Sequence, residues 1–275
     1  MISKMKNKRK YLIGSLVVVL LAVASLFSSC SKNEEVFKNR KVSFNSDWSF
    51  HLNDSIADKD TIGISTKWRT LDVPHDWSIE GKFDEKSPGG YGGGSLNGGL
   101  GWYKKTFKVA AEDSTKITSI TFDGVYRNSE VWINGHYLGK RPNGYIGFQY
   151  DMSPYLNYGD KNNEIIVKVD NSKQPNSRWY SGSGIFRNVW IETTDKVHVG
   201  QWGTYITTPK VTAEKASVSI ETTIKNQYAA SKKATVTTTI FKEDKKVASV
   251  TQDITINANE NQTLNQSTEV ENPAL

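Results

Sequence analysis

Residues 177–187 combine side chains that could bind a sugar. This segment places two arginines and several aromatic residues around a Gly-Ser-Gly turn. Flat aromatic faces suit the CH faces of sugar rings, and planar guanidinium groups suit sugar hydroxyls. Just upstream, Asp170 follows the β-rich run 165–169 and opens a loop, where a charged acceptor is well placed to face a ligand. Asp170 is therefore predicted to contact a ligand.

The same segment also fits a structural role. Trp179, Ile185 and Phe186 could belong to a hydrophobic core, while Arg178 and Arg187 could pair with internal acidic residues. The residue types alone do not separate this interpretation from sugar binding.

Other motifs give little support for catalysis in this chain. The glycine-rich run 89–101 lacks the ending of a phosphate-binding loop and precedes a strand, so we expect a flexible loop. His75 and Asp76 could be an acid/base pair, but adjacent residues in an extended chain point to opposite faces, which favours a structural role for His75. Ser183 lacks the Gly-x-Ser-x-Gly spacing of a serine hydrolase. No catalytic residue is predicted.

A metal or cofactor site is not expected either. His51, His136 and His198 show no spacing that is typical of zinc ligands. The single cysteine, Cys30, excludes an internal disulfide and a four-cysteine zinc site.

The candidate residues would be positioned by β-strands. No segment after the first 30 residues keeps a helical period, and turn signals such as Asn134-Gly135 separate β-rich segments. These segments are residues 102–109, 117–122, 129–133, 163–169 and 189–193. The sequence therefore predicts an all-β sandwich over residues 42–195.

The composition changes near residue 195. All eight tryptophans lie between Trp48 and Trp202, and the chain beyond is rich in Thr, Val, Ile and Lys. Such a shift marks a domain boundary. Residues 196–275 are predicted to form an immunoglobulin-like β-sandwich, which we expect to be incomplete because such a domain usually needs about 100 residues.

The N-terminus is typical of a secretion signal. Five basic residues precede an apolar run of 17 residues, and Ser28-Ser29-Cys30 resembles a bacterial lipoprotein cleavage box. We predict a signal peptide at residues 1–29, lipidation of Cys30 and a tether at residues 30–41. An uncleaved signal anchor is the alternative, because 17 residues is the short limit of a membrane span.

The location follows from the lipid anchor. The protein is expected to be exported and to sit on a membrane through acylated Cys30. In the lipoproteins that it resembles, a serine such as Ser31 after the cysteine favours the outer membrane, on its periplasmic face or at the cell surface.

The net charge of +6 does not indicate nucleic-acid binding. Five of the 35 basic residues lie in the first ten positions, and the chain after residue 29 has 30 basic residues against 29 acidic ones. A nearly neutral chain lacks the positive surface that nucleic acids require.

Six motifs together resemble one known family. They are residues 44–50, 73–77, 101–103, 122–126, 131–135 and 177–189. In this order they resemble the N-terminal part of a glycoside hydrolase family 2 protein, of the β-galactosidase type found among bacterial lipoproteins. The resemblance covers residues 42–275.

The resemblance carries expectations for fold and site. It implies a jelly-roll, galactose-binding-like sandwich, then an immunoglobulin-like sandwich, then a (β/α)₈ barrel with two glutamates for retaining hydrolysis. The sequence is expected to end before that barrel. In the family the first domain helps to complete the sugar subsite, and the acid of its Val-x-Val-Asp-Asn motif matches Asp170, with Arg178 and Trp179 as neighbours.

Two functions follow. The favoured one is the sugar-binding, accessory region of an exo-β-glycosidase that acts on a β-galactoside or a related glycoside. The full-length form would hydrolyse O-glycosyl bonds and could be a homo-oligomer, whereas these 275 residues alone are predicted to be inactive. The alternative is an autonomous, non-catalytic carbohydrate-binding surface lipoprotein.

Overall fold

The computed structural model describes residues 41–52 and 68–274. In this part the chain forms strands and four one-turn 3₁₀ helices. The predicted signal peptide at residues 1–29, Cys30 and the tether up to residue 40 lie outside the described residues. None of the helices in the described ranges is long and apolar enough to cross a membrane.

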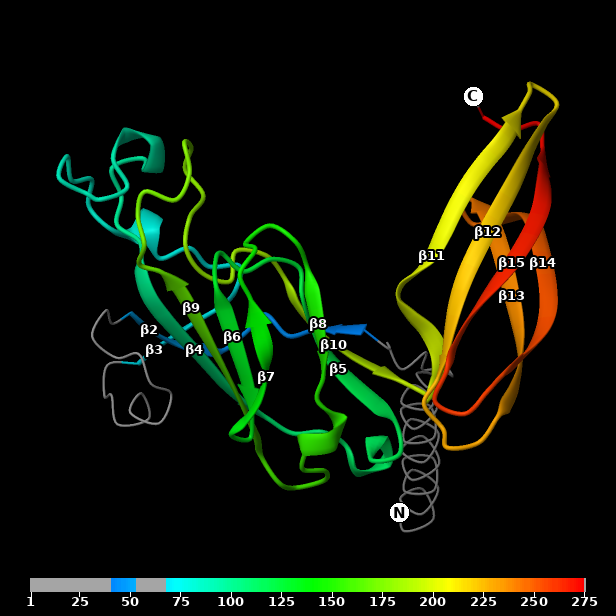
Figure 1. The fold of residues 1–275 in the computed structure, drawn as a ribbon, viewed down its shortest axis with the longest axis horizontal. Helices are drawn as coiled ribbons and strands as arrows, with labels where there is room; N and C mark the ends of the chain where they lie inside the picture. The colour runs from blue at the N-terminus through cyan, green and yellow to red at the C-terminus, as the bar shows by residue number, and fades with distance from the viewer. Residues whose placement is uncertain (1–40, 53–67, 275) are drawn as a thin grey trace, which may run out of the picture. The chain divides into compact units, whose positions relative to one another are not determined.

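The first sandwich consists of two antiparallel sheets (Figure 1), and these sheets share one hydrophobic core. The four-stranded sheet has the order β1-β10-β5-β8, and the six-stranded sheet has the order β3-β2-β4-β9-β6-β7. The strands are β1 (Lys41–Ser43), β2 (Trp48–Leu52), β3 (Arg69–Leu71), β4 (Gly99–Phe107), β5 (Ile117–Phe122), β6 (Ser129–Ile133), β7 (His136–Arg141), β8 (Phe148–Asp151), β9 (Asn163–Asn171) and β10 (Val189–Thr194).

Alternation along the strands builds this core. In β9, Ile165, Val167 and Val169 are 0% exposed, and the residues between them are more accessible. Successive side chains of a strand point to opposite faces, so one face of β9 is buried against the other sheet. Large aromatic side chains such as Trp48 and Phe122, both 0% exposed, fill the space between the sheets.

The hairpin predicted at Asn134-Gly135 is confirmed. Both residues have positive φ angles, 47° and 82°, and they connect β6 to β7 with Ile133 paired to His136. The glycine-rich run differs from the expectation in one respect. Gly99 to Gly101 belong to β4 rather than to a loop, because they pair with Val169 to Asn171 of β9.

The second sandwich is smaller. A three-stranded sheet of order β11-β12-β15 faces the two-stranded sheet β13-β14. Its strands are β11 (Val197–Val211), β12 (Lys215–Asn226), β13 (Lys232–Lys242), β14 (Lys245–Ile256) and β15 (Asn261–Glu271). Four buried residues form one core cluster, Ile224, Ile254, Ile256 and Leu264, and Ile220 of β12 is also buried, at 1% exposed. An immunoglobulin constant-type sandwich has seven strands, two more than the structure describes here.

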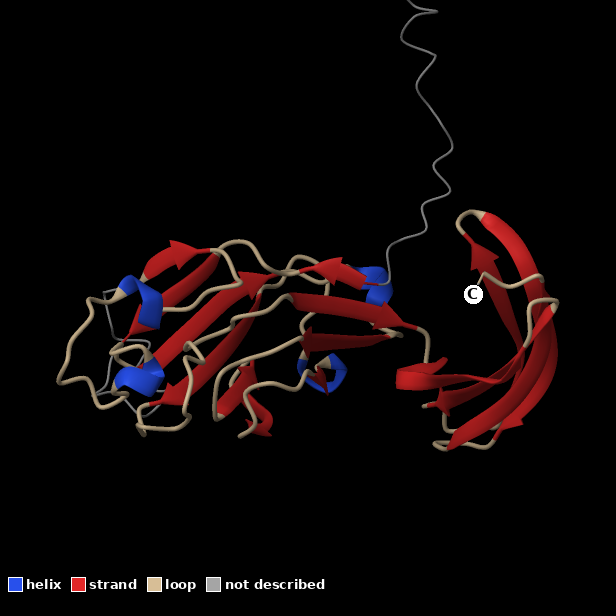
Figure 2. Cartoon of the chain, turned by 90° about the horizontal axis from the view of Figure 1, so that it is seen from above, coloured by secondary structure: helices blue, strands red, loops and turns tan. Residues whose placement is uncertain are grey.

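The predicted fold class is confirmed for the residues that the structure describes: an all-β fold with a jelly-roll sandwich followed by a smaller immunoglobulin-like one. In these residues Figure 2 shows strands, with helix confined to short turns. In the second sandwich β11 continues to Val211, and β15 consists mostly of polar residues, so its sequence carries only a weak strand signal.

Candidate functional site

Two loops leave the six-stranded sheet side by side at one end of the first sandwich. The loop before β4 contains residues 75–98, and the loop after β9 contains residues 172–188. Because Gly99 pairs with Asn171, the end of the first loop adjoins the start of the second. The pairing of β4 with β9 therefore brings the two candidate segments together.

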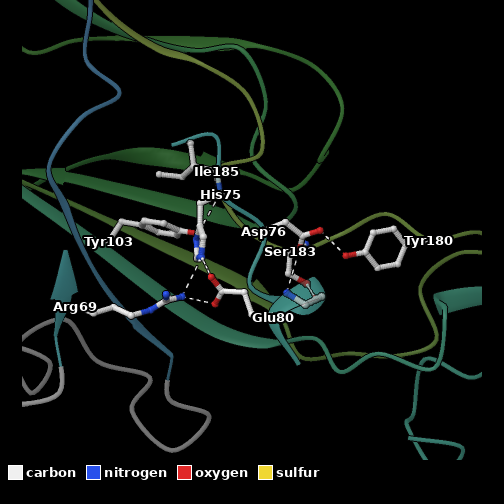
Figure 3. A network of polar contacts seen from close by, with 9 residues as sticks. Arg69, His75, Asp76, Glu80, Tyr103, Tyr180, Ser183 and Ile185 are labelled. Carbon is white, nitrogen blue, oxygen red and sulfur yellow. Dashed lines mark hydrogen bonds and ion pairs between the residues drawn. The ribbon is translucent and has the colours of Figure 1, made fainter. Parts of the chain in front are cut away.

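Asp76 joins these two loops (Figure 3). Its Oδ1 accepts hydrogen bonds from the backbone N–H of Ser78 at 2.9 Å and of Ser183 at 2.8 Å. Its Oδ2 accepts a hydrogen bond from the Tyr180 hydroxyl, and burial together with this carboxylate raises the pKa of Tyr180. Gly182 has φ 69°, and a Cβ there would lie 2.5 Å from Asp76 Oδ2, so only glycine fits.

Asn171 makes a second, buried connection. Its Nδ2 donates to Ser183 Oγ at 2.7 Å and to the Gly182 carbonyl at 3.1 Å, and its Oδ1 accepts a hydrogen bond from Asn176 Nδ2. Asn171 is 3% exposed and Ser183 is 0% exposed. Ser183 is therefore a structural hydroxyl that holds the loop.

His75 belongs to a separate network (Figure 3). Its Nδ1 lies 2.7 Å from the Tyr103 hydroxyl, and its Nε2 lies 3.2 Å from both Glu80 Oε1 and Arg69 Nη2. Arg69 and Glu80 also form an ion pair. Burial lowers the pKa of His75 below its ordinary value of 6.5, although Glu80 acts in the opposite direction. His75 and Asp76 thus contact different partners, as expected for adjacent residues of an extended chain.

Asp170 lies at the base of the second loop, at the end of β9. Its Oδ1 accepts hydrogen bonds from the Ser172 backbone N–H at 3.0 Å and from the Ser172 hydroxyl at 2.6 Å. Burial raises the pKa of Asp170, but these hydrogen bonds and the charge of Lys168 outweigh burial, so the pKa is lower than usual. Its side chain lies on the face opposite to that of Asn171, because the two are neighbours in a strand.

Arg178 and Trp179 lie on the exposed part of the same loop. The Trp179 side chain is 60% exposed, and its Nε1 donates to the Tyr145 hydroxyl at 2.9 Å. The Tyr145 ring packs edge-on against Tyr126 at 5.3 Å, and the Tyr126 hydroxyl donates to Asn176 Oδ1 at 3.3 Å. A continuous line of contacts therefore connects the exposed indole to the buried polar network.

Of the three predicted residues, Arg178 and Trp179 are neighbours in the sequence, and both are exposed. No hydrogen bond or ion pair between described residues joins Asp170 to either of them. The structural interpretation of the segment holds for Ile185, which is 0% exposed, and does not hold for Trp179.

A small polar cavity lies between the two loops. Its volume is about 20 Å³, and Asn171, Asn176 and Tyr180 are among the lining residues. Such a volume has room for about one water molecule. The rim beside this cavity is accessible, since Trp179 is 60% and Tyr180 is 40% exposed.

Sequence reasoning missed Asn171 and the role of Asp76. For Asn171 a signal was present, because the two-residue period that buries Val167 and Val169 also places Asn171 on the inner face of β9. For Asp76 no local signal exists, since its partner Ser183 is 107 residues away. In residues 41–52 and 68–274, no group of three or more His, Cys, Asp or Glu side chains could hold a metal ion.

Comparison with known proteins identifies the family of this fold. The family model described as "Glycosyl hydrolases family 2, sugar binding domain" matches residues 41–195, which include both loops of the candidate site. A solved structure of a glycosyl hydrolase family 2 member from Bacteroides cellulosilyticus superimposes with a TM-score of 0.79 at 34% identity, over 86% of this chain and 31% of that chain.

Relatives of known sequence agree. A β-galactosidase of Bacteroides ovatus, BoGH2A, is 50% identical over 208 residues, which are 76% of this chain and 24% of the relative. A β-glucuronidase of Formosa agariphila is 30% identical over 84% of this chain and 26% of the relative. The chain thus spans about a quarter of the length of these relatives, and it belongs to glycoside hydrolase family 2, whose sugar-binding domain forms its first sandwich.

Proposed function

We propose that the exposed rim of residues 177–180 forms one wall of a sugar subsite in a β-glycosidase. The observation that carries this proposal is the position of Trp179, whose ring is 60% exposed while its Nε1 is held by Tyr145. A flat aromatic face that is accessible and fixed in place suits the CH face of a sugar ring. Asp76 and Asn171 fix the loop that carries it.

Asp170 supports this wall from the base of the loop. It is ionised at neutral pH, since its pKa lies below the ordinary value, and its Oδ1 is engaged by Ser172. A carboxylate can accept about four hydrogen bonds, so Asp170 retains capacity for sugar hydroxyls. Where these residues are followed by a catalytic barrel, Asp170→Asn should lower kcat/KM by at least about tenfold, with little loss of fold.

The substrate class that we propose is a β-galactoside. The support is the relative at 50% identity, which is named a β-galactosidase. The β-glucuronidases among these relatives are less similar: two from Formosa agariphila, one of them named putative, are 40% and 30% identical. Hydrolysis would require two carboxyl groups about 5 to 5.5 Å apart on a barrel, so we expect residues 31–275 alone to hydrolyse no aryl β-glycoside.

The test is a titration of residues 31–275 with methyl β-galactoside and methyl β-glucuronide, observed at the Trp179 indole N–H by NMR. One wall of a subsite should give a saturable shift with a dissociation constant in the millimolar range or weaker, and the galactoside should bind better. Arg178→Ala should weaken binding, whereas Arg187→Ala serves as the control in the same segment. An unchanged Trp179 signal contradicts the proposal, and micromolar affinity favours an autonomous binding protein.

We also propose that the protein is exported and lipid-anchored at the outer membrane through Cys30. The support is the order of a basic stretch, an apolar run and Ser28-Ser29-Cys30. Cys30→Ser should abolish labelling by a radioactive fatty acid and shift the protein out of the membrane fraction, whereas the control Asn33→Ala should leave both unchanged. Unchanged labelling of the Cys30→Ser protein contradicts this proposal.

A further inference from the structure

A groove on the outer face of the four-stranded sheet is separate from the loop site. It has a volume of about 370 Å³, and no residue that lines it also lines the cavity between the loops. Sites for small ligands usually have volumes of about 300 to 1,000 Å³. The groove lies within the compact unit Lys41–Leu275 and is lined by β1, β5, β8, β10 and the start of β11. We call it the sheet groove.

Three polar side chains form an ordered floor. Thr121 of β5 stands opposite Gln149 of β8, so their side chains share a face, while Ile120 and Phe122 point into the core. Gln149 Nε2 donates to Thr121 Oγ1 at 3.0 Å and to Glu192 Oε2 at 3.3 Å. Thr121 Oγ1 donates to Glu192 Oε1 at 3.3 Å. These bonds hold an amide and a carboxylate in place without a ligand.

The floor retains hydrogen-bonding capacity. A carboxylate has about four acceptor positions and an amide has two donors and a carbonyl acceptor. Thr121 is only 7% exposed, so its contacts are made away from bulk water. Lys41 stands at the edge of the groove with its Nζ 3.5 Å from Glu192 Oε1. Fixed acceptors and donors around a concave surface are what sugar hydroxyls need.

An aromatic wall completes the groove. Trp202 lines it and is 77% exposed. It stands in an irregularity of β11, where the register with β12 shifts between Val199 and Thr204. A Cβ at Gly203 would lie 2.7 Å from the Gly200 carbonyl oxygen, so this bulge needs glycine. Bulges often re-aim a side chain, and this one presents an indole beside the polar floor.

The charges of the groove favour a neutral ligand. Two carboxylates, Asp123 and Glu192, line it together with one ammonium group, that of Lys41. His198 also lines the groove, and burial lowers its pKa below 6.5, so its ring is neutral at pH 7. The net charge of the lining is therefore negative, which disfavours uronates, sulfated sugars and phosphates.

We propose that the sheet groove is a second saccharide-binding site, which takes a neutral sugar unit between the Thr121–Gln149–Glu192 floor and the Trp202 ring. It would hold a glycan chain away from the loop site and keep the protein on its substrate. Because linked sites raise the effective concentration, even weak binding here would increase overall affinity for a polymer. The proposal does not depend on the function proposed for the loops.

The two exposed indoles allow the sites to be tested separately. Residues 31–275 are titrated with methyl β-galactoside and with galacturonate, and the indole N–H signals of Trp202 and Trp179 are followed by NMR. We expect a saturable shift of Trp202 with the neutral sugar and at least about fivefold weaker binding of galacturonate. Gln149→Ala should weaken the Trp202 response to the neutral sugar at least about fivefold.

Two further variants complete the test. Glu192→Gln keeps the size of the side chain and should reduce the preference for the neutral sugar. Trp179→Ala should leave the Trp202 titration within about twofold, since it belongs to the other site. The proposal is overturned if the Trp202 signal does not shift, if it responds equally to both sugars, or if Gln149→Ala and Glu192→Gln both titrate like the wild type. Loss of the Trp179 response alone would contradict only the function proposed for the loops.

Discussion

The two sandwiches use the same strand chemistry but differ in how well they close their cores. In the first, buried aromatic residues and aliphatic residues from both sheets form one continuous core. In the second, Ile206 of β11 pairs with Ile220 of β12 on the inner face, yet Ile206 is 58% exposed whereas Ile220 is 1% exposed. The edge of the two-stranded sheet does not cover β11. Pairing between two strands of a sheet therefore does not by itself ensure a closed core.

The polar networks of the candidate site lie on the first sandwich. The hydrogen bonds of Asp76 and Asn171 hold long loops in place on the first sandwich, whose layers are filled. The second sandwich has short turns, and several of its exposed apolar residues, among them Tyr205, Ile206 and Val211, lie along β11 at the edge of its sheet. Such an edge favours association with another chain. The closed first sandwich thus carries the loops of the candidate site, whereas the second sandwich exposes apolar residues along β11.

The largest expected effect compares matched core deletions. Ile120→Ala in β5 should destabilise the first sandwich by about 4 kcal/mol, because atoms from both sheets would surround the cavity that the shorter side chain leaves. Ile220→Ala in β12 should cost only about 2 kcal/mol, because the site is open beside Ile206. Native-state amide exchange of β5 and β12 measures both changes. In the wild type, the amides of residues 200–271 should exchange faster than those of residues 100–190. Equal exchange rates in the two ranges would contradict the difference in stability between the sandwiches.

A smaller effect is expected from two buried amides. Asn171 holds a loop of the first sandwich, and Asn226, which is 1% exposed, donates to the carbonyls of Ala230, Ile256 and Asn257 in the second. Each change to alanine should cost about 2 kcal/mol, because buried partners lose their hydrogen bonds. Asn171→Ala should also broaden the Trp179 indole signal, and Asn226→Ala should not. A Trp179 signal that is unaffected by Asn171→Ala would show that Asn171 does not hold the loop in place.

The pH dependence of stability compares one histidine from each sandwich. Burial lowers the pKa values of His75 and His198 below 6.5 in the folded protein. Between the folded-state pKa and 6.5 the unfolded chain binds a proton that the folded chain does not, so stability falls as the pH falls below 6.5. The slope should be at most about 1.4 kcal/mol per pH unit for each histidine.

Urea denaturation between pH 7 and pH 5 checks this prediction. His75→Gln should flatten the profile of the first sandwich, and His198→Gln that of the second. Glu80 and Arg69 face His75 with opposite charges, so Glu80→Gln serves as the control that removes the favourable partner of a protonated ring. If the free energy of unfolding falls more steeply with decreasing pH in His75→Gln than in the wild type, then His75 does not lower stability at acidic pH and the prediction is wrong.

The smallest effect concerns two accessible carboxylates. Asp170 accepts a hydrogen bond from the Ser172 hydroxyl at 2.6 Å, and Asp253 in the second sandwich accepts one from the Thr235 hydroxyl at 2.7 Å. Both contacts are solvated, so Asp170→Asn and Asp253→Asn should each change stability by less than about 1 kcal/mol. Thermal unfolding measures both. A much larger loss for Asp170→Asn would make it a structural residue rather than a binding residue.

The sequence by itself determined the strands and the class of fold. β-rich composition predicted β5 at residues 117–122 and β6 at residues 129–133 with their observed bounds, because β-branched and aromatic residues favour strands. Asn134-Gly135 predicted the hairpin turn, since the positive φ angles of both residues are a local property. The ordered motifs indicated the family, which the match over residues 41–195 confirmed.

Only the tertiary structure decided which loops meet and what each side chain contacts. Asp76 reaches Ser183 across 107 residues, and Trp179 reaches Tyr145 across 34. The two-residue alternation of a strand shows which of its residues are buried, but it does not show which distant loop lies beside them. The exposure of Trp179 and Trp202, against the burial of Trp48 and Trp102, likewise depends on the second layer that each tryptophan meets. Contacts between segments far apart in sequence are set by how the sheets stack, and that is a property of the whole fold.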